Sequence, residues 1–383
     1  MTNKTILSSA LVLILVTSMT SFSAYAVEPN PPQDGVQYKF FEISSSSLTS
    51  IVNKWINAYH GLYQGVTIKS DYVNSNNAIY QYTKKVVPIV NSDTPLGTSN
   101  AKKVPDALII PSSIHTVAII YNIPEFKQSG LNLNGTVLAD IYLGKIIYWN
   151  DPKIQSLNPG VNLPSARITP IHRVDPSGIT YTFTQYLSSV SKTWKTSFGK
   201  GTTGSWKTGS VDGSFKGDYV IAFDVSNTPY SIGYSDLGNA IKYKQTYAAI
   251  QNGDGTGFVV PSLEASTAAA SAVSGKLPEA NADWSKVSII NAPGTNSYPI
   301  VGFNYILTYQ NLDKIKGLDK NTSSTVLDQI YWDVTDGQKY LGPLYLAQLP
   351  DNVTEIDKRG LGDIDFKGSQ LFAYDGFVVE PIQ

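Results

Sequence analysis

Short runs of β-branched and aromatic residues alternate with amphipathic helical patterns along most of this 383-residue chain. The run YKFFEI at 38–43 is typical of a strand, and apolar residues then recur at helical spacing through 44–59. VTIKSDYV at 66–73 predicts the next strand, and a second helix is expected through Ala78 to Tyr82. This alternation favours a series of α/β units and argues against an all-α or an all-β domain.

The middle of the chain contains the segment expected to connect two domains. A chain of 383 residues is long enough for two domains, each with its own core. The apolar, β-rich segment at 107–126 predicts buried strands that run from one domain into the next, and the return crossing is expected at 297–309. Between them, 138–160 predicts a helix followed by a polar turn, and the Ser/Gly-rich stretch at 198–218 predicts a loop.

The N-terminus has the pattern of an export signal. Residues 1–26 carry one lysine, an apolar run centred on Ala10 to Val16 and the small-x-small triplet Ala24-Tyr25-Ala26. We therefore expect cleavage before Val27 and a proline-rich, disordered leader at 27–36. The alternative is that the apolar run is retained as an anchor. With cleavage, the product is an exported protein, periplasmic or extracellular.

Composition excludes several classes of function. The formal net charge is −1 and charged residues make up only 15%, which gives no reason to expect a nucleic acid or an anionic membrane as partner. The chain has no cysteine, so disulfides, thiolate metal sites and cysteine nucleophiles are excluded.

Three predicted strand-to-helix junctions consist of small hydroxyl or amide residues. They are SSSS at 44–47, NSNN at 74–77 and DPSGIT at 175–180. Each start of a helix offers unpaired N–H donors at a positively polarised end. If the three junctions meet at one crevice of an open sheet, they form a trap for a small anion. The alternative is that serine and asparagine here only cap helices.

The same two interpretations apply to RVDPSGITYTFTQYL at 173–187. In the first, Asp175 or Ser177 caps a helix, Pro176 occupies its first turn and Arg173 is a solvated surface charge. In the second, Arg173 and the start of the helix form a cradle for an oxyanion.

Four phrases resemble those of the phosphate-binding proteins of ABC-type phosphate importers, the PstS family of the periplasmic-binding-protein superfamily. They are LADIYLGKIIYWNDPKIQSLNPGVNLP, RVDPSGITYTFTQYLSSV, SIGYSDLGNAIKY and NSDTPL. The first two are the most specific, and they occur in the family's order at nearly the family's distance. The resemblance covers the chain from about Tyr38 to its C-terminus.

The resemblance implies an α/β fold of the type II periplasmic-binding-protein class. Two lobes joined by crossing strands would close around a ligand in the cleft between them. We expect the first lobe to comprise 37–119 and 298–383, and the second to comprise 120–297.

The resemblance also implies a set of residues that bind inorganic phosphate. Arg173, Ser177, Gly178 and Ile179 match the family's R-x-D-x-S-G-T, although Ile179 stands where the family has a threonine. The complete predicted set is Ser46, Ser47, Ser75, Asp93, Arg173, Ser177, Gly178 and Ile179.

Each predicted role has a chemical reason. Arg173 can offer a bidentate fork, and Gly178 lets the backbone approach the ligand closely. The carboxylate of Asp93 can accept the proton of hydrogen phosphate but would repel sulfate, which carries no proton at neutral pH.

The family's partner is a membrane permease, and we expect a monomer that needs no cofactor or metal. Two alternatives remain: a secreted phosphatase, and an envelope or adhesion protein that keeps the fold without a ligand. Against an enzyme, His60, His115 and His172 are the only histidines and have no metal-ligand spacing. His172 adjoins Arg173 on a predicted strand, where it is expected to pack or cap.

Overall fold

The computed structural model of this chain describes residues 28–203, 206, 211–213 and 219–374. The predicted signal peptide at 1–26 lies outside the described residues. Residues 28–36 of the predicted leader precede the first strand, and there the Gln33 N–H donates to Tyr38 Oη at 3.3 Å.

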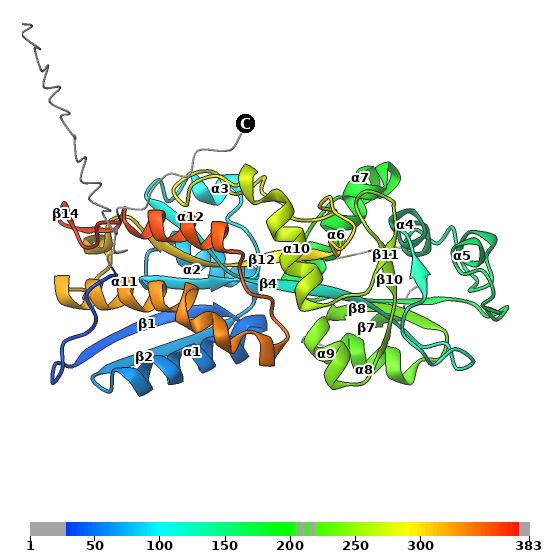
Figure 1. The fold of residues 1–383 in the computed structure, drawn as a ribbon, viewed down its shortest axis with the longest axis horizontal. Helices are drawn as coiled ribbons and strands as arrows, with labels where there is room; N and C mark the ends of the chain where they lie inside the picture. Colours follow the sequence, from blue (N-terminus) through cyan, green and yellow to red (C-terminus); the bar gives the residue numbers. More distant parts are fainter. Residues whose placement is uncertain (1–27, 204–205, 207–210, 214–218, 375–383) are drawn as a thin grey trace, which may run out of the picture.

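One mixed sheet runs through the whole molecule (Figure 1). Its strand order is β2-β1-β3-β12-β4-β8-β6-β7, and β9 also pairs with β4. The bounds of these strands are β1 Tyr38–Ser45, β2 Val66–Val73, β3 Ile89–Ser92, β4 Ala107–Tyr121, β6 Thr169–Arg173, β7 Val211–Gly213, β8 Ser231–Asp236, β9 Thr246–Tyr247 and β12 Val301–Tyr309. Two small sheets contain β5 Asn132–Leu133, β10 Ala249–Gln251, β11 Phe258–Val259, β13 Asp365–Phe366 and β14 Ser369–Gln370.

Helices cover the faces of this sheet, as burying its apolar surface requires. The α-helices are α1 Thr49–Leu62, α2 Ser75–Thr83, α3 Thr98–Ala101, α4 Gly135–Tyr142, α5 Pro152–Leu157, α6 Gly178–Val190, α7 Lys192–Ser197, α8 Tyr219–Asn227, α9 Leu237–Lys242, α10 Leu263–Val273, α11 Lys320–Val334 and α12 Asp351–Leu361. Five 3₁₀ turns complete the set: η1 Ser46–Leu48, η2 Ser274–Lys276, η3 Leu312–Lys314, η4 Asp336–Tyr340 and η5 Gly342–Leu344.

The elements form two lobes, with β4 and β12 between them. In Figure 1 the lobe on the left carries β1, β2, α1, α2, α11 and α12, and the lobe on the right carries α4 to α9 with β7 and β8. All fifteen residues of β4 are buried. The strand pairs with β12 up to Thr116 and with β8 from Val117 onward, so it changes lobes at that step. The predicted crossing by 107–126 is seen in β4. The return crossing at 297–309 stays a prediction.

The segment before β12 lies against the first lobe. Ile109 N–H donates to Ala280 O at 2.8 Å, and the ring of Trp284 packs edge-on against Phe303 and Tyr305. This segment precedes the predicted boundary at 297/298, and the other boundary at 119/120 falls inside β4. Both lobe boundaries stay predictions.

Two local predictions were wrong. Residues 198–218 were expected to be loop, but β7 lies within them because β6 offers it a parallel partner, with Ile171 opposite Val211. The first helix was expected to be led by the four serines at 44–47, but Ser44 and Ser45 still belong to β1, where they pair with β2. The regular helix α1 starts only at Thr49, after the 3₁₀ turn η1.

Candidate functional site

The carboxyl ends of parallel strands place polar residues of both lobes at one cleft. In the first lobe β1 is parallel to β2 and to β3, so these strands end at the same edge. In the second lobe β6 is parallel to β8. Ligands of open α/β sheets bind at such edges. A cleft of about 590 Å³ lies there, and its walls include Ser46, Ser47, Asp93 and Ile179 of the predicted set.

In the first lobe three serines are linked to one carboxylate. Ser47 Oγ donates to Asp93 Oδ2 at 2.6 Å and lies 3.0 Å from Ser45 Oγ. Ser45 Oγ in turn lies 3.2 Å from Ser75 Oγ, on the first residue of α2. The ends of β1 and β3 and the start of α2 therefore converge, as the junction hypothesis required.

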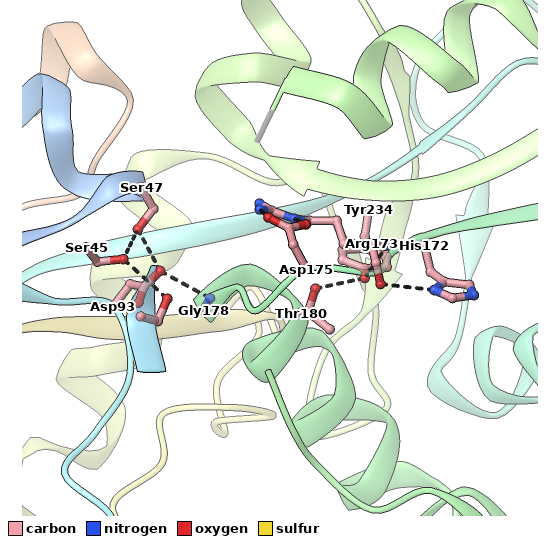
Figure 2. Close-up of polar contacts among 10 residues, drawn as sticks. Ser45, Ser47, Asp93, His172, Arg173, Asp175, Gly178, Thr180 and Tyr234 are labelled. Carbon is pink, nitrogen blue, oxygen red and sulfur yellow. Dashed lines mark hydrogen bonds and ion pairs between the residues drawn. The ribbon is translucent and has the colours of Figure 1, made fainter. Parts of the chain in front are cut away.

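The second lobe meets this network through the first residue of α6. Gly178 N–H donates to Asp93 Oδ2 at 3.1 Å. A carboxylate of the first lobe therefore accepts a hydrogen bond from the first residue of α6 in the second lobe. Figure 2 shows Gly178 and Ser47 each joined to Asp93, and Ser45 joined to Ser47. A Cβ on residue 178 would lie 2.5 Å from Asp93 Oδ2, closer than real atoms approach, so the contact requires glycine.

Two buried polar atoms beside this contact have no hydrogen-bond partner among the described residues. They are Asp93 Oδ1 and Ser177 Oγ. Asp93 and Ser177 are each only 3% exposed, so bulk water does not readily supply the missing hydrogen bonds. One atom is an acceptor and the other can donate. A small ligand with both a proton to give and an oxygen to share would satisfy both atoms.

Arg173 ends β6 as a buried residue, with 6% of its surface exposed. Its Nε donates to Asp175 Oδ1 at 3.0 Å and its Nη2 to Asp175 Oδ2 at 2.5 Å. In Figure 2 this pair extends from its backbone toward the side where Gly178 and Asp93 lie. The interpretation of Arg173 as a solvated surface charge is wrong, because the residue is buried. Its ion pair with Asp175 offsets the cost of removing the charge from water.

The local structure confirms one of the two expected caps, Ser177, and corrects the position of Pro176. Ser177 is the N-cap residue of α6, without a side-chain cap hydrogen bond, and Pro176 precedes the cap instead of occupying the first turn. Tyr234 Oη accepts the backbone N–H of Arg173 at 3.2 Å and lies 2.9 Å from Thr180 Oγ1. Through these two contacts Tyr234 links the end of β6 to α6. No pattern in the sequence predicted this role for Tyr234.

The predicted residues do not all join the hydrogen-bonded network. Ser46 lines the cleft as an exposed residue, and the buried Ser45 takes part in the network in its place. Ile179 lines the cleft with an apolar side chain and is 6% exposed. Ser45 lay within the predicted SSSS junction and was one residue away from the predicted pair.

His115 is a further residue of the cleft that the sequence did not single out. It lies on β4, and its Nδ1 is 2.9 Å from Asn304 Oδ1 on β12. Its Nε2 is 2.7 Å from Thr182 Oγ1 on α6. Burial lowers the pKa of His115, so the imidazole is neutral at neutral pH.

His172 packs, as expected. Its ring centroid lies 4.4 Å from that of Trp206, and its Nδ1 is 3.1 Å from the backbone oxygen of Arg173. In the part of the chain that the structure describes, no group of three or more histidine, cysteine, aspartate or glutamate side chains could hold a metal ion. Within the same ranges no helix has the length and apolar character needed to cross a membrane.

Comparison with known proteins identifies the family. A family model described as a PBP superfamily domain matches residues 40–320. The phosphate-binding protein PstS of Methanocaldococcus jannaschii is 35% identical over 317 residues, covering 80% of this chain and 81% of that protein. The phosphate-binding protein PstS of Xylella fastidiosa strain Temecula1 is 35% identical over 344 residues, covering 88% and 89%. The chain belongs to the PstS family of the PBP superfamily.

Solved structures with the fold of the PstS family support the architecture. A putative phosphate ABC transporter substrate-binding protein from Clostridium perfringens, solved with bound phosphate, is 16% identical with a TM-score of 0.55. It covers 82% of this chain, and all of that chain is matched. A phosphate-binding protein from Stenotrophomonas maltophilia is 13% identical with a TM-score of 0.59, covering 84% and 94%. The predicted two-lobed α/β fold and the resemblance to the PstS family are thus confirmed.

Proposed function

We propose that this chain captures inorganic phosphate between its lobes and delivers it to the membrane permease of an ABC-type importer. The observation that carries the proposal is the contact of Asp93 with the start of α6 beside two unpaired buried atoms, Asp93 Oδ1 and Ser177 Oγ. Relatives named as PstS phosphate-binding proteins support it.

The chemistry of hydrogen phosphate fits these groups. Asp93 Oδ1 would accept the proton of the ligand, while Ser177 Oγ and the first N–H groups of α6 would donate to its oxygens. Ser47 and Ser75 would complete the first-lobe side, and Arg173 would supply the positive charge that a desolvated dianion needs. Sulfate offers no proton at neutral pH, so Asp93 would repel it.

In the cell, the protein would act as an exported, periplasmic or extracellular monomer that binds phosphate without turnover, cofactor or nucleic acid. Ligand contacts with both lobes would drive closure, and the permease would recognise the closed form.

Calorimetric titration of the mature chain with phosphate and with sulfate tests the proposal. We expect one phosphate per chain. Arg173→Ala should abolish measurable binding, because truncating a buried charge partner costs about 2–5 kcal/mol or more. Asp93→Asn should narrow the gap between phosphate and sulfate. Arg167→Ala, which removes an exposed arginine, is the matched control and should bind like the unmodified chain.

Unchanged phosphate affinity in both Arg173→Ala and Asp93→Asn would contradict the assigned site. Release of phosphate from a phosphomonoester by the purified chain would favour the phosphatase alternative instead.

A further inference from the structure

A loop of the second lobe reaches the start of a helix in the first lobe. The loop follows α7 and includes Gly201 and Thr202. Thr202 Oγ1 donates to Asn76 Oδ1 at 3.3 Å, and Asn76 is the second residue of α2. In Figure 1, α2 lies in the left-hand lobe and α7 in the right-hand one. This hydrogen bond therefore joins the lobes separately from the contact of Gly178 with Asp93.

Thr202 also holds the start of α6 through its backbone. The Ser177 N–H donates to Thr202 O at 2.9 Å. Ser177 is the N-cap residue of α6, and its Oγ is the buried atom that has no partner among the described residues. A single residue thus contacts two helix starts, α6 through its backbone oxygen and α2 through its hydroxyl.

The loop that carries Thr202 is tied to the body of α6. Thr184, within α6, is only 2% exposed, and its Oγ1 accepts the N–H of Gly201 at 3.0 Å. The same Oγ1 lies 3.0 Å from Gly201 O. The second lobe therefore holds Thr202 in place through its own contacts, and the hydrogen bond to Asn76 is what Thr202 adds across the lobes.

Two contacts between the lobes restrict their relative motion more than one contact does. The hydrogen bond of Gly178 to Asp93 alone leaves the lobes free to rotate about it. The hydrogen bond of Thr202 to Asn76 opposes that rotation. Under the proposed function the starts of α2 and α6 both direct N–H donors at the ligand, so their relative orientation decides whether both can reach it.

We propose that Thr202 is a positioning residue of the phosphate site, which sets the start of α6 against the start of α2 and slows the opening of the lobes around bound phosphate. The inference rests on the proposed function, because Thr202 acts through Ser177 and Asn76 and does not itself contact the ligand. The hydrogen bond to Asn76 forms only while the lobes are together, so its loss affects release more than capture.

The rate at which ³²P-labelled phosphate leaves the loaded mature chain tests the inference. Thr202→Val removes the hydroxyl but keeps the backbone oxygen that Ser177 uses. We expect release to become about twofold to tenfold faster, with a matching loss of affinity in a calorimetric titration. The midpoint of urea unfolding without phosphate should change little, because Thr202 is only half-buried. Thr202→Ser brings the hydroxyl back and should recover most of the lost affinity.

A double variant separates the hydrogen bond from a general effect of the loop. Asn76→Ala removes the acceptor, so it should weaken phosphate binding by about the same factor as Thr202→Val does. The two changes together should weaken binding no further, because either one alone already breaks the hydrogen bond. Thr203→Val is the matched control, since Thr203 is the exposed neighbour on the same loop, and its release rate should stay within about twofold of the unmodified chain.

The outcomes distinguish the two proposals. If phosphate binds but Thr202→Val releases it no faster than Thr203→Val does, the inference is overturned and the proposed function stands. The same holds if Thr202→Ser recovers nothing, or if the losses in Thr202→Val and Asn76→Ala multiply in the double variant. If the unmodified chain fails to bind phosphate, the proposed function is overturned, and the inference with it.

Discussion

Gly178 and Asp93 form a direct contact between the lobes at the candidate site. The Gly178 N–H donates to the Asp93 carboxylate, and the backbone oxygen of Asp93 also lies near the position that a Cβ on residue 178 would take. A carboxylate at the positive end of a helix is stabilised by the unpaired N–H groups there. The same helix end would serve a phosphate under the proposed function, in which Asp93 would both link the lobes and border the ligand.

Gly178→Ala tests this contact. The new methyl group cannot fit while Asp93 stays in place, and overpacking of this kind costs about 1–3 kcal/mol. We expect phosphate affinity to fall at least about tenfold in a calorimetric titration, while the midpoint of urea unfolding changes little because the lobes can separate.

Gly61→Ala is the control for that experiment. A Cβ on Gly61, within α1, would meet nothing within 4 Å. This variant should keep full phosphate affinity and gain about 0.5–1 kcal/mol of stability, because alanine is favoured over glycine in a helix. Equal affinities in the two variants would show that the Gly178–Asp93 contact does not matter for binding.

The serine junction shows what a sequence can predict at this scale. SSSS at 44–47 was correctly expected at the cleft, but four identical residues cannot reveal which of them point inward. That choice depends on where β1 ends and η1 begins, which pairing with β2 decides. Similarly, the burial of Arg173 follows from its pairing with Asp175, and charge alone suggested a surface position.

Among the elements, β4 was the most predictable, because its long run of apolar and small residues predicts a buried strand. Its fifteen residues are almost all apolar or small, and a buried crossing strand is the structure that accommodates such a run. In contrast, β7 has three residues, and its strand conformation comes from its neighbour β6. Short elements of this kind depend on tertiary contacts that no local pattern records.

His115 connects three elements whose relative position shapes the site. From β4 it contacts Asn304 of β12 and Thr182 of α6, and all three residues are at most 4% exposed. Because α6 provides Ser177 and Gly178, the imidazole fixes the second-lobe side of the cradle relative to β4 and β12.

His115→Leu should destabilise the protein by about 2–6 kcal/mol, because it leaves two buried polar groups unpaired at about 1–3 kcal/mol each. Urea unfolding at pH 7 measures this. Adding Thr182→Val to His115→Leu removes one of the unpaired groups and should recover about 1 kcal/mol. If the double variant is less stable than the single one, the His115–Thr182 hydrogen bond is not the relevant interaction.

The pH dependence follows from the lowered pKa of His115. Below the ordinary histidine pKa of about 6.5 the unfolded chain takes up a proton that the folded chain resists, so stability falls as the pH drops toward the lowered value. Between pH 7 and pH 5 the unmodified chain should therefore lose more stability than His115→Leu does. A parallel pH profile for the two proteins would mean that His115 titrates normally.

At the scale of the whole molecule, function requires the lobes to separate and close again. The strands β4 and β12 lie between the lobes, and the contacts at Gly178 and Gly238 lie across the cleft from one lobe to the other. A ligand enclosed between them can leave only if these contacts open. Locking one of them should therefore trap phosphate without altering the cradle itself.

The chain offers a clean way to make this lock, because it has no cysteine of its own. A Cβ on residue 238 would lie 3.4 Å from Tyr345 Cβ, close to the separation of about 3.5–4.5 Å found in disulfides. In the double variant Gly238→Cys/Tyr345→Cys, oxidation after loading with ³²P-phosphate should slow release at least about tenfold, and dithiothreitol should restore the original rate. The two single variants are the controls and should release phosphate at the same rate with or without oxidant. A disulfide that forms in full, as shown by the loss of both free thiols, yet leaves release unchanged would mean that phosphate does not sit between the lobes.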